Sequence, residues 1–478
     1  MNTPFFPAWR RKLAAVGRRT LLGTRQTPAE IEEQCGRFLS KTALIPPPTG
    51  AASRRRVFFL SRVFWCLVWQ VMQPRTSCRA VVRQVQAWCE TERTRFDESN
   101  SAYCQARARL PLSTLEQALQ DSARAADRLC RAGVPGWTRP VKVVDGSSVR
   151  LPDTPANRKA YPYPSGQKSG CGFPVMGFVG LYSLSSGAIL KTVQGPWQSH
   201  DMRLFKELWP ELQPGDVLLG DRAFGAFLLL AHFPKKQVDV VARLHQTRAF
   251  DRRHAKKLGP SDWLVTWTRP HHRPDYVSKD EWAALPDSIT VRIIRVRVQA
   301  KGFRTRELWI CTTLLDPIAY PAELIAQLYL RRWDLELCFR DLKTTMGMES
   351  LRCKSPAMVH KELLAFLIAH NFIRCLISEA ASTHDVSRTR ISFKGAVDAA
   401  RSFYQAMRVT TSKRKANGLY RRLLHILAHD LVPLRPGRLE PRAVKLRPKN
   451  FPRLTQPRHR FKEVPHRGRP LGKSPCFS

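Results

Sequence analysis

The sequence predicts a mixed α/β protein whose β-rich middle is flanked by helical segments. From about Val141 to Asp221, short apolar or alternating runs are separated by Gly, Ser and Pro, as strands joined by turns require. The flanking stretches read instead as helical. The 478 residues suffice for two to four domains, and a hydrophobic fraction of 43% supports a folded chain with a buried core.

The net charge of the chain indicates which class of partner it binds. The chain has 80 Lys and Arg residues against 38 Asp and Glu, which gives a formal net charge of +42. A charge of this size requires a polyanionic partner, most often nucleic acid. An anionic membrane surface would normally come with an anchor or a lipid-binding helix. The longest apolar run, residues 57–72, is short for a membrane span and contains Arg62, so we expect a buried helix and no membrane partner.

The N-terminal region, residues 1–135, is expected to be helical and to bind DNA ends. Ser101 begins a segment in which Arg107 and Arg109 alternate with small residues, as in a basic helix that lies along DNA. An ordinary helical subdomain with a solvated basic face fits these residues equally well.

Strand patterns then dominate as far as residue 318. Residues 138–235 predict the first part of a catalytic core, with Asp145 in VKVVDGSSV and Asp221 in DVLLGDRAF at or near strand ends. Residues 236–318 contain WLVTW, ITVRIIRVRV and RELWICTTLL, which are rich in β-branched and aromatic residues. We interpret this segment as a β-rich insertion in the core.

Helix returns at Pro321, and residues 319–430 predict the second part of the core together with C-terminal helices. The last segment, residues 431–478, alternates proline with Arg and Lys and contains only Glu440 and Glu463 as acids. This composition favours a flexible basic arm over a packed domain.

A third carboxylate lies in the returning helix with three polar companions. Tyr329, Arg332, Glu336 and Lys343 are spaced by 3, 4 and 7 residues, which predicts that they share one face of a helix. A carboxylate between two cations and a phenol suits a site that holds both a metal ion and a phosphate backbone. Each residue alone has an ordinary explanation, such as a surface ion pair or a packed tyrosine.

Asp145, Asp221 and Glu336 together suit phosphodiester chemistry. Two Mg²⁺ ions about 3.5–4 Å apart can clamp the attacking and leaving oxygens, and such hard cations prefer carboxylate ligands. We expect Asp145 to bridge both ions, while Asp221 and Glu336 each complete one. His200 in WQSHDM is better interpreted as a loop or structural histidine than as part of this site.

These motifs resemble the cut-and-paste DDE transposases of bacterial insertion sequences, in particular the insertion sequence four family. Tyr329, Arg332, Glu336 and Lys343 match the family signature Y-x2-R-x3-E-x6-K without a departure. The family's other two motifs are matched by Asp145-Gly146-Ser147 and by Asp221-Arg222-Ala223-Phe224. The resemblance covers roughly residues 95–460.

The resemblance implies a ribonuclease-H-like core with the β-rich insertion, and Mg²⁺ as the cofactor, for which Mn²⁺ can substitute. It implies that water nicks the element end, that the freed 3′-OH forms a hairpin on the opposite strand, and that the reopened end attacks target DNA. The implied DNA contacts are Tyr329, Arg332, Lys343 and Arg222, with Trp309 or Trp333 stacking on a flipped base. Taken alone, each tryptophan fits a core position better than a base-stacking role.

The implied partners are double-stranded DNA, as terminal inverted repeats and as target, and a second copy of the chain in a synaptic homodimer. The implied location is the bacterial cytoplasm, in association with the nucleoid. Two alternatives remain open: a structure-specific nuclease of the same fold, and a catalytically inactive DNA-binding protein derived from a transposase.

Overall fold

The computed structural model describes residues 35–46, 50, 57–73, 76–89, 99–130, 133–164, 172–245, 248, 250, 252–297, 307–408, 410, 412–434 and 460. The first 34 residues of the expected helical region, and nearly all of the expected basic arm at 431–478, lie outside the described residues.

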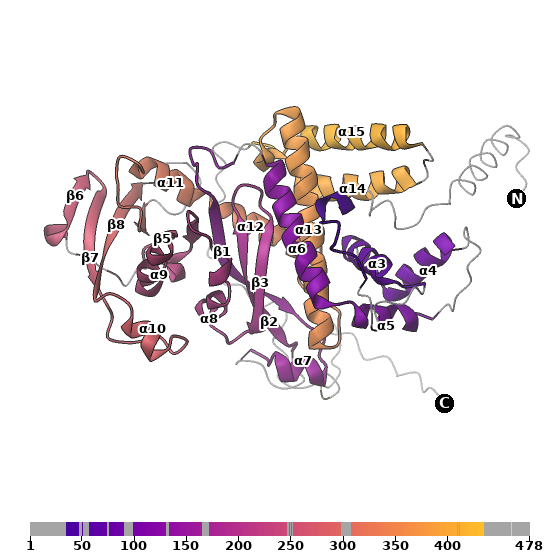
Figure 1. Ribbon diagram of the computed structural model, residues 1–478, viewed down its shortest axis with the longest axis horizontal. Helices are drawn as coiled ribbons and strands as arrows, with labels where there is room; N and C mark the ends of the chain where they lie inside the picture. Colours follow the sequence, from indigo (N-terminus) through magenta and orange to yellow (C-terminus); the bar gives the residue numbers. More distant parts are fainter. Residues whose placement is uncertain are drawn as a thin grey trace, which may run out of the picture.

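The strands of the described chain form one mixed sheet of nine, in the order β3-β2-β1-β4-β5-β9-β8-β7-β6 (Figure 1). Strand β1 pairs antiparallel with β2 and parallel with β4, and β4 pairs parallel with β5. From β5 onward the pairing is antiparallel, so the strands predicted after residue 236 continue the same sheet. The strands are β1 (Val141–Arg150), β2 (Val175–Ser183), β3 (Ile189–Pro196), β4 (Val217–Gly220), β5 (Asp239–Arg243), β6 (Lys256–Gly259), β7 (Asp262–Thr268), β8 (Ser288–Arg297) and β9 (Glu307–Thr312).

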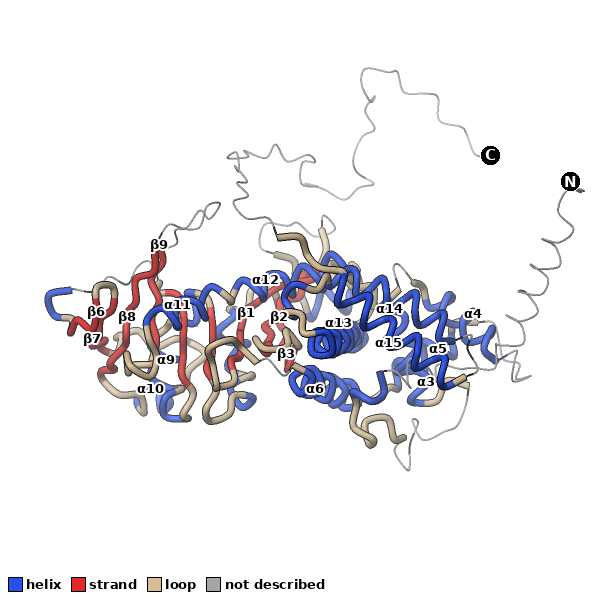
Figure 2. Tube along the Cα trace, turned by 90° about the horizontal axis from the view of Figure 1, so that it is seen from above, coloured by secondary structure: helices blue, strands red, loops and turns tan. Residues whose placement is uncertain are grey.

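Helices lie on both faces of this sheet and form a separate group beyond β3 (Figures 1 and 2). They are α3 (Leu60–Met72), α4 (Cys78–Cys89), α5 (Ser101–Arg109), α6 (Leu112–Leu129), α7 (Pro155–Ala160), α8 (Asp201–Lys206), α9 (Phe227–His232), α10 (Lys279–Ala283), α11 (Ala322–Leu330), α12 (Trp333–Arg340), the π-helical turn η7 (Asp341–Thr345), α13 (Pro356–His384), α14 (Phe393–Arg408) and α15 (Lys413–His429).

Two hydrophobic cores cover the two faces of the sheet, because successive residues of a strand point to opposite sides. Val143 belongs to one core, which includes buried residues of α6, α11, α12 and α13. Its neighbour Val144 belongs to the other core, which includes buried residues of α8 and α9. The segments that carry the predicted site therefore sit on a sheet that is packed on both sides.

The 29-residue helix α13 runs through the centre of the helical group, with α6 beside it (Figure 1). It is the one helix of the described chain that is long and apolar enough to cross a membrane, yet 94% of its apolar window is buried inside the fold. Helix α3, from the run predicted as a buried helix, also packs against α13, with Phe64, Trp65 and Val68 almost fully buried. The prediction of a buried helix in this run is confirmed.

A buried ion pair ties the outer strands to the start of α11. Arg292 on β8 is fully buried and donates to the Asp262 carboxylate on β7 at 2.9 Å from Nε. Its Nη1 also donates to the carbonyl oxygens of Leu314, Asp316 and Tyr320, at 3.2, 3.3 and 2.7 Å. The loop that leads into α11 is thereby held against the sheet.

Candidate active site

Two of the predicted carboxylates lie side by side on parallel neighbours in the sheet. Strands β1 and β4 pair in register up to Val143 and Leu219, and Asp145 and Asp221 each follow two residues later. Asp145 lies within β1, which continues to Arg150 because β2 pairs with it along its length. The Asp-Gly sequence is therefore part of a strand and not a turn.

Asp145 is a partly buried carboxylate that lies close to other negative charges. Its Oδ1 accepts a hydrogen bond from the Gly146 N–H at 2.8 Å. Burial nevertheless raises the pKa of Asp145 to about 6, and the charges of Asp221 and Asp201 add to this effect, while Arg332 opposes it. The site thus concentrates negative charge around Asp145.

Asp221 begins a short 3-10 turn, Arg222–Phe224, after β4. One of its oxygens, Oδ1, accepts a hydrogen bond from the Ala223 N–H at 2.8 Å and so fixes the direction of the carboxylate. Arg222 is exposed on this turn, directly next to the carboxylate.

The single helix predicted for Tyr329, Arg332, Glu336 and Lys343 is wrong. Helix α11 ends at Leu330, α12 begins at Trp333, and Lys343 lies in the π-helical turn η7. The break arises because the N–H groups of Arg331 and Arg332 bond three residues back, to Leu328 and Tyr329, both at 3.0 Å. The four side chains consequently do not form one stripe.

Arg332 nevertheless contacts both Glu336 and Asp145. Its Nη2 donates to Glu336 Oε1 at 3.2 Å, and its Nη1 lies 3.8 Å from Asp145 Oδ2. The Arg332 side chain is 12% exposed, against 45% for Glu336. Glu336 is therefore linked to Asp145 through a largely buried guanidinium.

Tyr329 lies on the same side of the cluster, next to Arg332. Burial raises the pKa of its phenol to about 12, opposed by the positive charges of Arg332 and Arg243 and reinforced slightly by Asp221. The hydroxyl thus stays protonated and can donate a hydrogen bond near neutral pH.

Lys343 lies farther along the edge of the sheet. Burial lowers its pKa, and the charged groups that influence it are Glu349 and Arg150, at the far end of β1. Among the described residues, no ion pair links Lys343 to the three carboxylates, whereas Arg332 pairs with two of them.

The two predicted base-stacking tryptophans have different surroundings. Trp309 on β9 stacks on Trp263 at 5.8 Å between ring centroids, with Phe250 edge-on at 5.7 Å. Trp333 is 48% exposed, and the Arg332 guanidinium lies 5.5 Å from its ring centroid. The structure therefore places Trp333 next to the carboxylates and packs Trp309 among aromatic rings of the outer strands.

The sequence pattern did not single out a fourth carboxylate, Asp201. A Cβ atom built on Gly146 would lie 2.6 Å from Asp201 Oδ2, so this exposed carboxylate lies against the strand next to Asp145. Partial burial of this carboxylate raises the pKa of Asp201; His200 opposes the rise, and the charge of Asp221 adds to it. His200, directly before it, accepts from the Met202 N–H at 3.2 Å as a helix cap, in agreement with a structural role.

The oxygen-rich set fits a hard divalent cation, because a cation would relieve the repulsion that Asp221 and Asp201 impose on Asp145. Within the described residues, no three His, Cys, Asp or Glu side chains are already placed to hold a metal ion. Arg332 lies between two of the candidate ligands instead.

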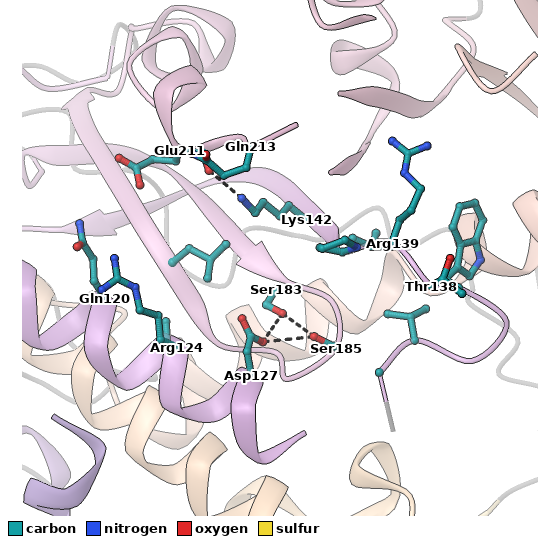
Figure 3. Close-up of a pocket in the computed structure, with 17 residues that line it drawn as sticks. Gln120, Arg124, Asp127, Thr138, Arg139, Lys142, Ser183, Ser185, Glu211 and Gln213 are labelled. Atoms are coloured by element: carbon teal, nitrogen blue, oxygen red, sulfur yellow. Dashed lines mark hydrogen bonds between the residues drawn. The ribbon is translucent and has the colours of Figure 1, made fainter. Parts of the chain in front are cut away.

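A cavity of about 560 Å³ opens at the opposite, N-terminal end of β1, between α6 and the sheet (Figure 3). Several of its polar groups have internal partners: Asp127 accepts hydrogen bonds from the Ser183 and Ser185 hydroxyls at 2.6 and 3.3 Å. Lys142 pairs with Asp216 at 2.6 Å. None of the predicted site residues lines this cavity, so it is a separate structural feature.

Comparison with known proteins finds similarity to transposases in a family model, in a curated protein and in a solved structure. A family model described as a transposase DDE domain matches residues 136–372, a range that contains all three predicted carboxylates. Transposase InsG for insertion sequence element IS4, from Escherichia coli (strain K12), is 25% identical over 412 residues, which cover 84% of this chain and 88% of that protein. A cryo-EM structure of the piggyBac transposase synaptic complex with hairpin DNA covers 84% of this chain and 85% of that chain, at 9% identity and a TM-score of 0.38.

Proposed function

We propose that this chain, which is a DDE transposase of the IS4 type, cuts and joins DNA strands with Asp145, Asp221 and Glu336 as its catalytic residues. The observation that carries the assignment is the placement of Asp145 in β1 and of Asp221 directly after the adjacent parallel strand β4, with Glu336 joined to Asp145 through Arg332. The family match covers the range in which all three residues lie, and the contacts among them support their assignment to one site.

DDE transposases generally use divalent metals, and we propose two Mg²⁺ ions here, held by the three carboxylates, with Mn²⁺ as a substitute. When bound, such ions activate the attacking oxygen and balance the charge that develops on the phosphate. The chain itself supplies the oxygen ligands and fixes their directions through the Gly146 and Ala223 N–H groups.

The proposed reaction runs from a nick at the element end, through a hairpin that is reopened, to attack of the 3′-OH on target DNA. Tyr329 can donate a hydrogen bond to a phosphate oxygen, while Arg332, Lys343 and Arg222 supply positive charge along the same edge of the sheet. A flipped base would stack on Trp333, which is exposed beside the carboxylates, or on Trp309 after repacking of its neighbours.

We further propose a ribonuclease-H-like core formed by β3, β2, β1, β4 and β5. Its support is the strand order, in which an antiparallel hairpin adjoins parallel strands that carry the first two carboxylates. On this view the segment 236–318 is an insertion whose strands β6–β9 extend the core sheet, and residues 138–235 and 319–430 form the two parts of the core. Residues 1–135 are proposed to bind the element ends, and 431–478 to form a basic arm.

The proposed partners follow from the relatives and from the charge of +42: terminal inverted repeats, target DNA and a second copy of the chain. The proposed place of action is the bacterial cytoplasm, in contact with the nucleoid.

The test uses the full-length chain, Mg²⁺ and a labelled duplex that carries the element's inverted repeats. Nicks, hairpins and joined products together support the proposal. Nicks without joined products would indicate a structure-specific nuclease, and a gel shift without cleavage would indicate an inactive DNA-binding protein. Replacing Mg²⁺ with Mn²⁺ should preserve the products.

A further inference from the structure

Arg332 sits where the proposed cations would act. Its two terminal nitrogens lie 3.2 Å from Glu336 Oε1 and 3.8 Å from Asp145 Oδ2. The guanidinium therefore neutralises two of the three carboxylates that are proposed to bind metal. Its positive charge would repel a divalent cation at the same carboxylates, since the interaction of charges about 4 Å apart is strong in a partly buried site.

The contacts of Arg332 differ from those of an ordinary surface ion pair. The side chain is 12% exposed, and its Nε is buried with no hydrogen-bond partner among the described residues. A buried donor without a partner carries a free-energy cost that another acceptor would remove. The guanidinium also lies over the exposed Trp333 ring, 5.5 Å from its centroid.

We propose that Arg332 is a positioning residue that serves as the counter-ion of Asp145 and Glu336 until divalent cations bind, and then turns to a DNA phosphate. This inference rests on the proposed function, because it assumes that these carboxylates hold cations. It explains why no three acidic side chains of the described chain are placed as metal ligands while the guanidinium is between them. Cation binding and phosphate binding become coupled, because each favours the same position of Arg332.

The test measures Mn²⁺ affinity of the full-length chain without DNA, by calorimetry and by the electron spin resonance signal of free Mn²⁺. Arg332→Gln should bind Mn²⁺ with a Kd at least about tenfold lower than the unmodified chain, because a competing positive charge is lost. Arg332→Lys should change the Kd less. A weaker or unchanged affinity in Arg332→Gln would overturn the proposal, because a purely structural role predicts a loosened Glu336 and poorer binding.

Arg331→Gln provides the matched control. This substitution removes the same charge one residue away from Arg332. Arg331 pairs with Asp334 at 3.5 Å and not with the site carboxylates. The Mn²⁺ affinity of Arg331→Gln should stay within about twofold of that of the unmodified chain. An equal gain in affinity in Arg331→Gln and Arg332→Gln would show that the gain comes from the lower net charge and not from the position of Arg332. The gain in Arg332→Gln should also disappear when Asp145→Asn is added, and a gain that survives would place the cation elsewhere.

Coupling to DNA gives a second readout. With Ca²⁺ as the cation, the unmodified chain should bind a terminal-repeat duplex more tightly than it does in EDTA, and Arg332→Gln should lose most of this gain. Equal gains in both proteins would contradict the transfer to phosphate. The two proposals can fail separately: a chain that cuts DNA but shows no raised Mn²⁺ affinity in Arg332→Gln refutes only the counter-ion role. A chain that cannot cut but shows the gain refutes only the transposase reaction.

Discussion

The carboxylate of Asp201 occupies the space that a side chain on residue 146 would need, because a Cβ atom on Gly146 would lie 2.6 Å from Asp201 Oδ2. Glycine at this position thus lets a fourth carboxylate approach the strand that carries Asp145. The contact also shows that the start of α8, which follows β3, faces β1, although β2 lies between β3 and β1 in the sheet.

Gly146→Ala should therefore displace Asp201. We expect a loss of about 1 kcal/mol in the free energy of unfolding, because the exposed carboxylate can move aside only partly. The same substitution in an Asp201→Ala background should cost almost nothing. Urea unfolding of the four proteins measures this double-mutant cycle, and equal costs in both backgrounds would show that the two residues do not compete for space.

The raised pKa of Asp145 predicts a pH dependence of stability in cation-free buffer. Because the folded pKa of about 6 lies above the value of the unfolded chain, the contribution of Asp145 is fully favourable below about pH 4 and is lost as the pH rises through 6. The loss is at most about 3 kcal/mol, and less to the extent that water screens the site.

Asp145→Asn should remove this pH-dependent term. Relative to the unmodified chain, the variant should gain stability as the pH is raised from 4 to 7 in EDTA, measured by urea unfolding at each pH. A stability difference that stays constant over this range would mean that the pKa of Asp145 is not raised in the folded chain.

Substitution of Trp309 should mainly affect the stability of the fold, and substitution of Trp333 should mainly affect the reaction. Trp309→Ala should destabilise the fold by about 2–4 kcal/mol, because it removes a ring packed on Trp263 and Phe250. Trp333→Ala should change stability by less than about 1 kcal/mol, since the ring is 48% exposed, and should lower the yield of hairpin. Thermal unfolding and gel analysis of hairpins measure the two effects. A stable Trp309→Ala protein that fails only at the hairpin step would show that Trp309, and not Trp333, stacks on the flipped base.

The buried pair of Asp262 and Arg292 should be important for stability. Asp262→Ala leaves the fully buried Arg292 without its carboxylate, so we expect a loss of about 3–5 kcal/mol. The exposed pair Lys394–Asp398 is the comparison, and Asp398→Ala should cost less than about 1 kcal/mol. Similar costs for both, measured by urea unfolding, would show that Arg292 does not brace the loop before α11.

Much of the site was predictable from the sequence because Asp145 and Asp221 follow buried strand patterns, and Glu336 follows a helical one. Patterns of burial identify an element, but not its neighbours. Asp201 could not be placed beside Asp145 for that reason, since their proximity depends on the path of the chain after β3. The same limit applies to β6–β9, whose composition predicts strands but not that they extend the sheet of β1 and β4.

The break between α11 and α12 had no sequence signal either. Neither Pro nor Gly occurs between Leu330 and Trp333, and the break consists of N–H groups that bond three residues back instead of four. A fixed spacing of 3, 4 and 7 residues therefore predicted one helical face, whereas the structure places Tyr329 in α11, Arg332 in the break before α12, and Lys343 in η7. What survives is the contact of Arg332 with Glu336, which lies within one turn.

The most direct test of the account is the rate of the first nick in Asp145→Ala, Asp221→Ala and Glu336→Ala, with DNA binding measured in parallel. Each variant should lose at least about a thousandfold in rate, because the proposed chemistry needs all three carboxylates to hold the cations, while binding of the terminal-repeat duplex is retained. Asp334→Ala, which removes an acid on the same helix that pairs with Arg331, should still cut. If all three carboxylate variants nick the element end at the rate of the unmodified chain, the proposed active site is contradicted.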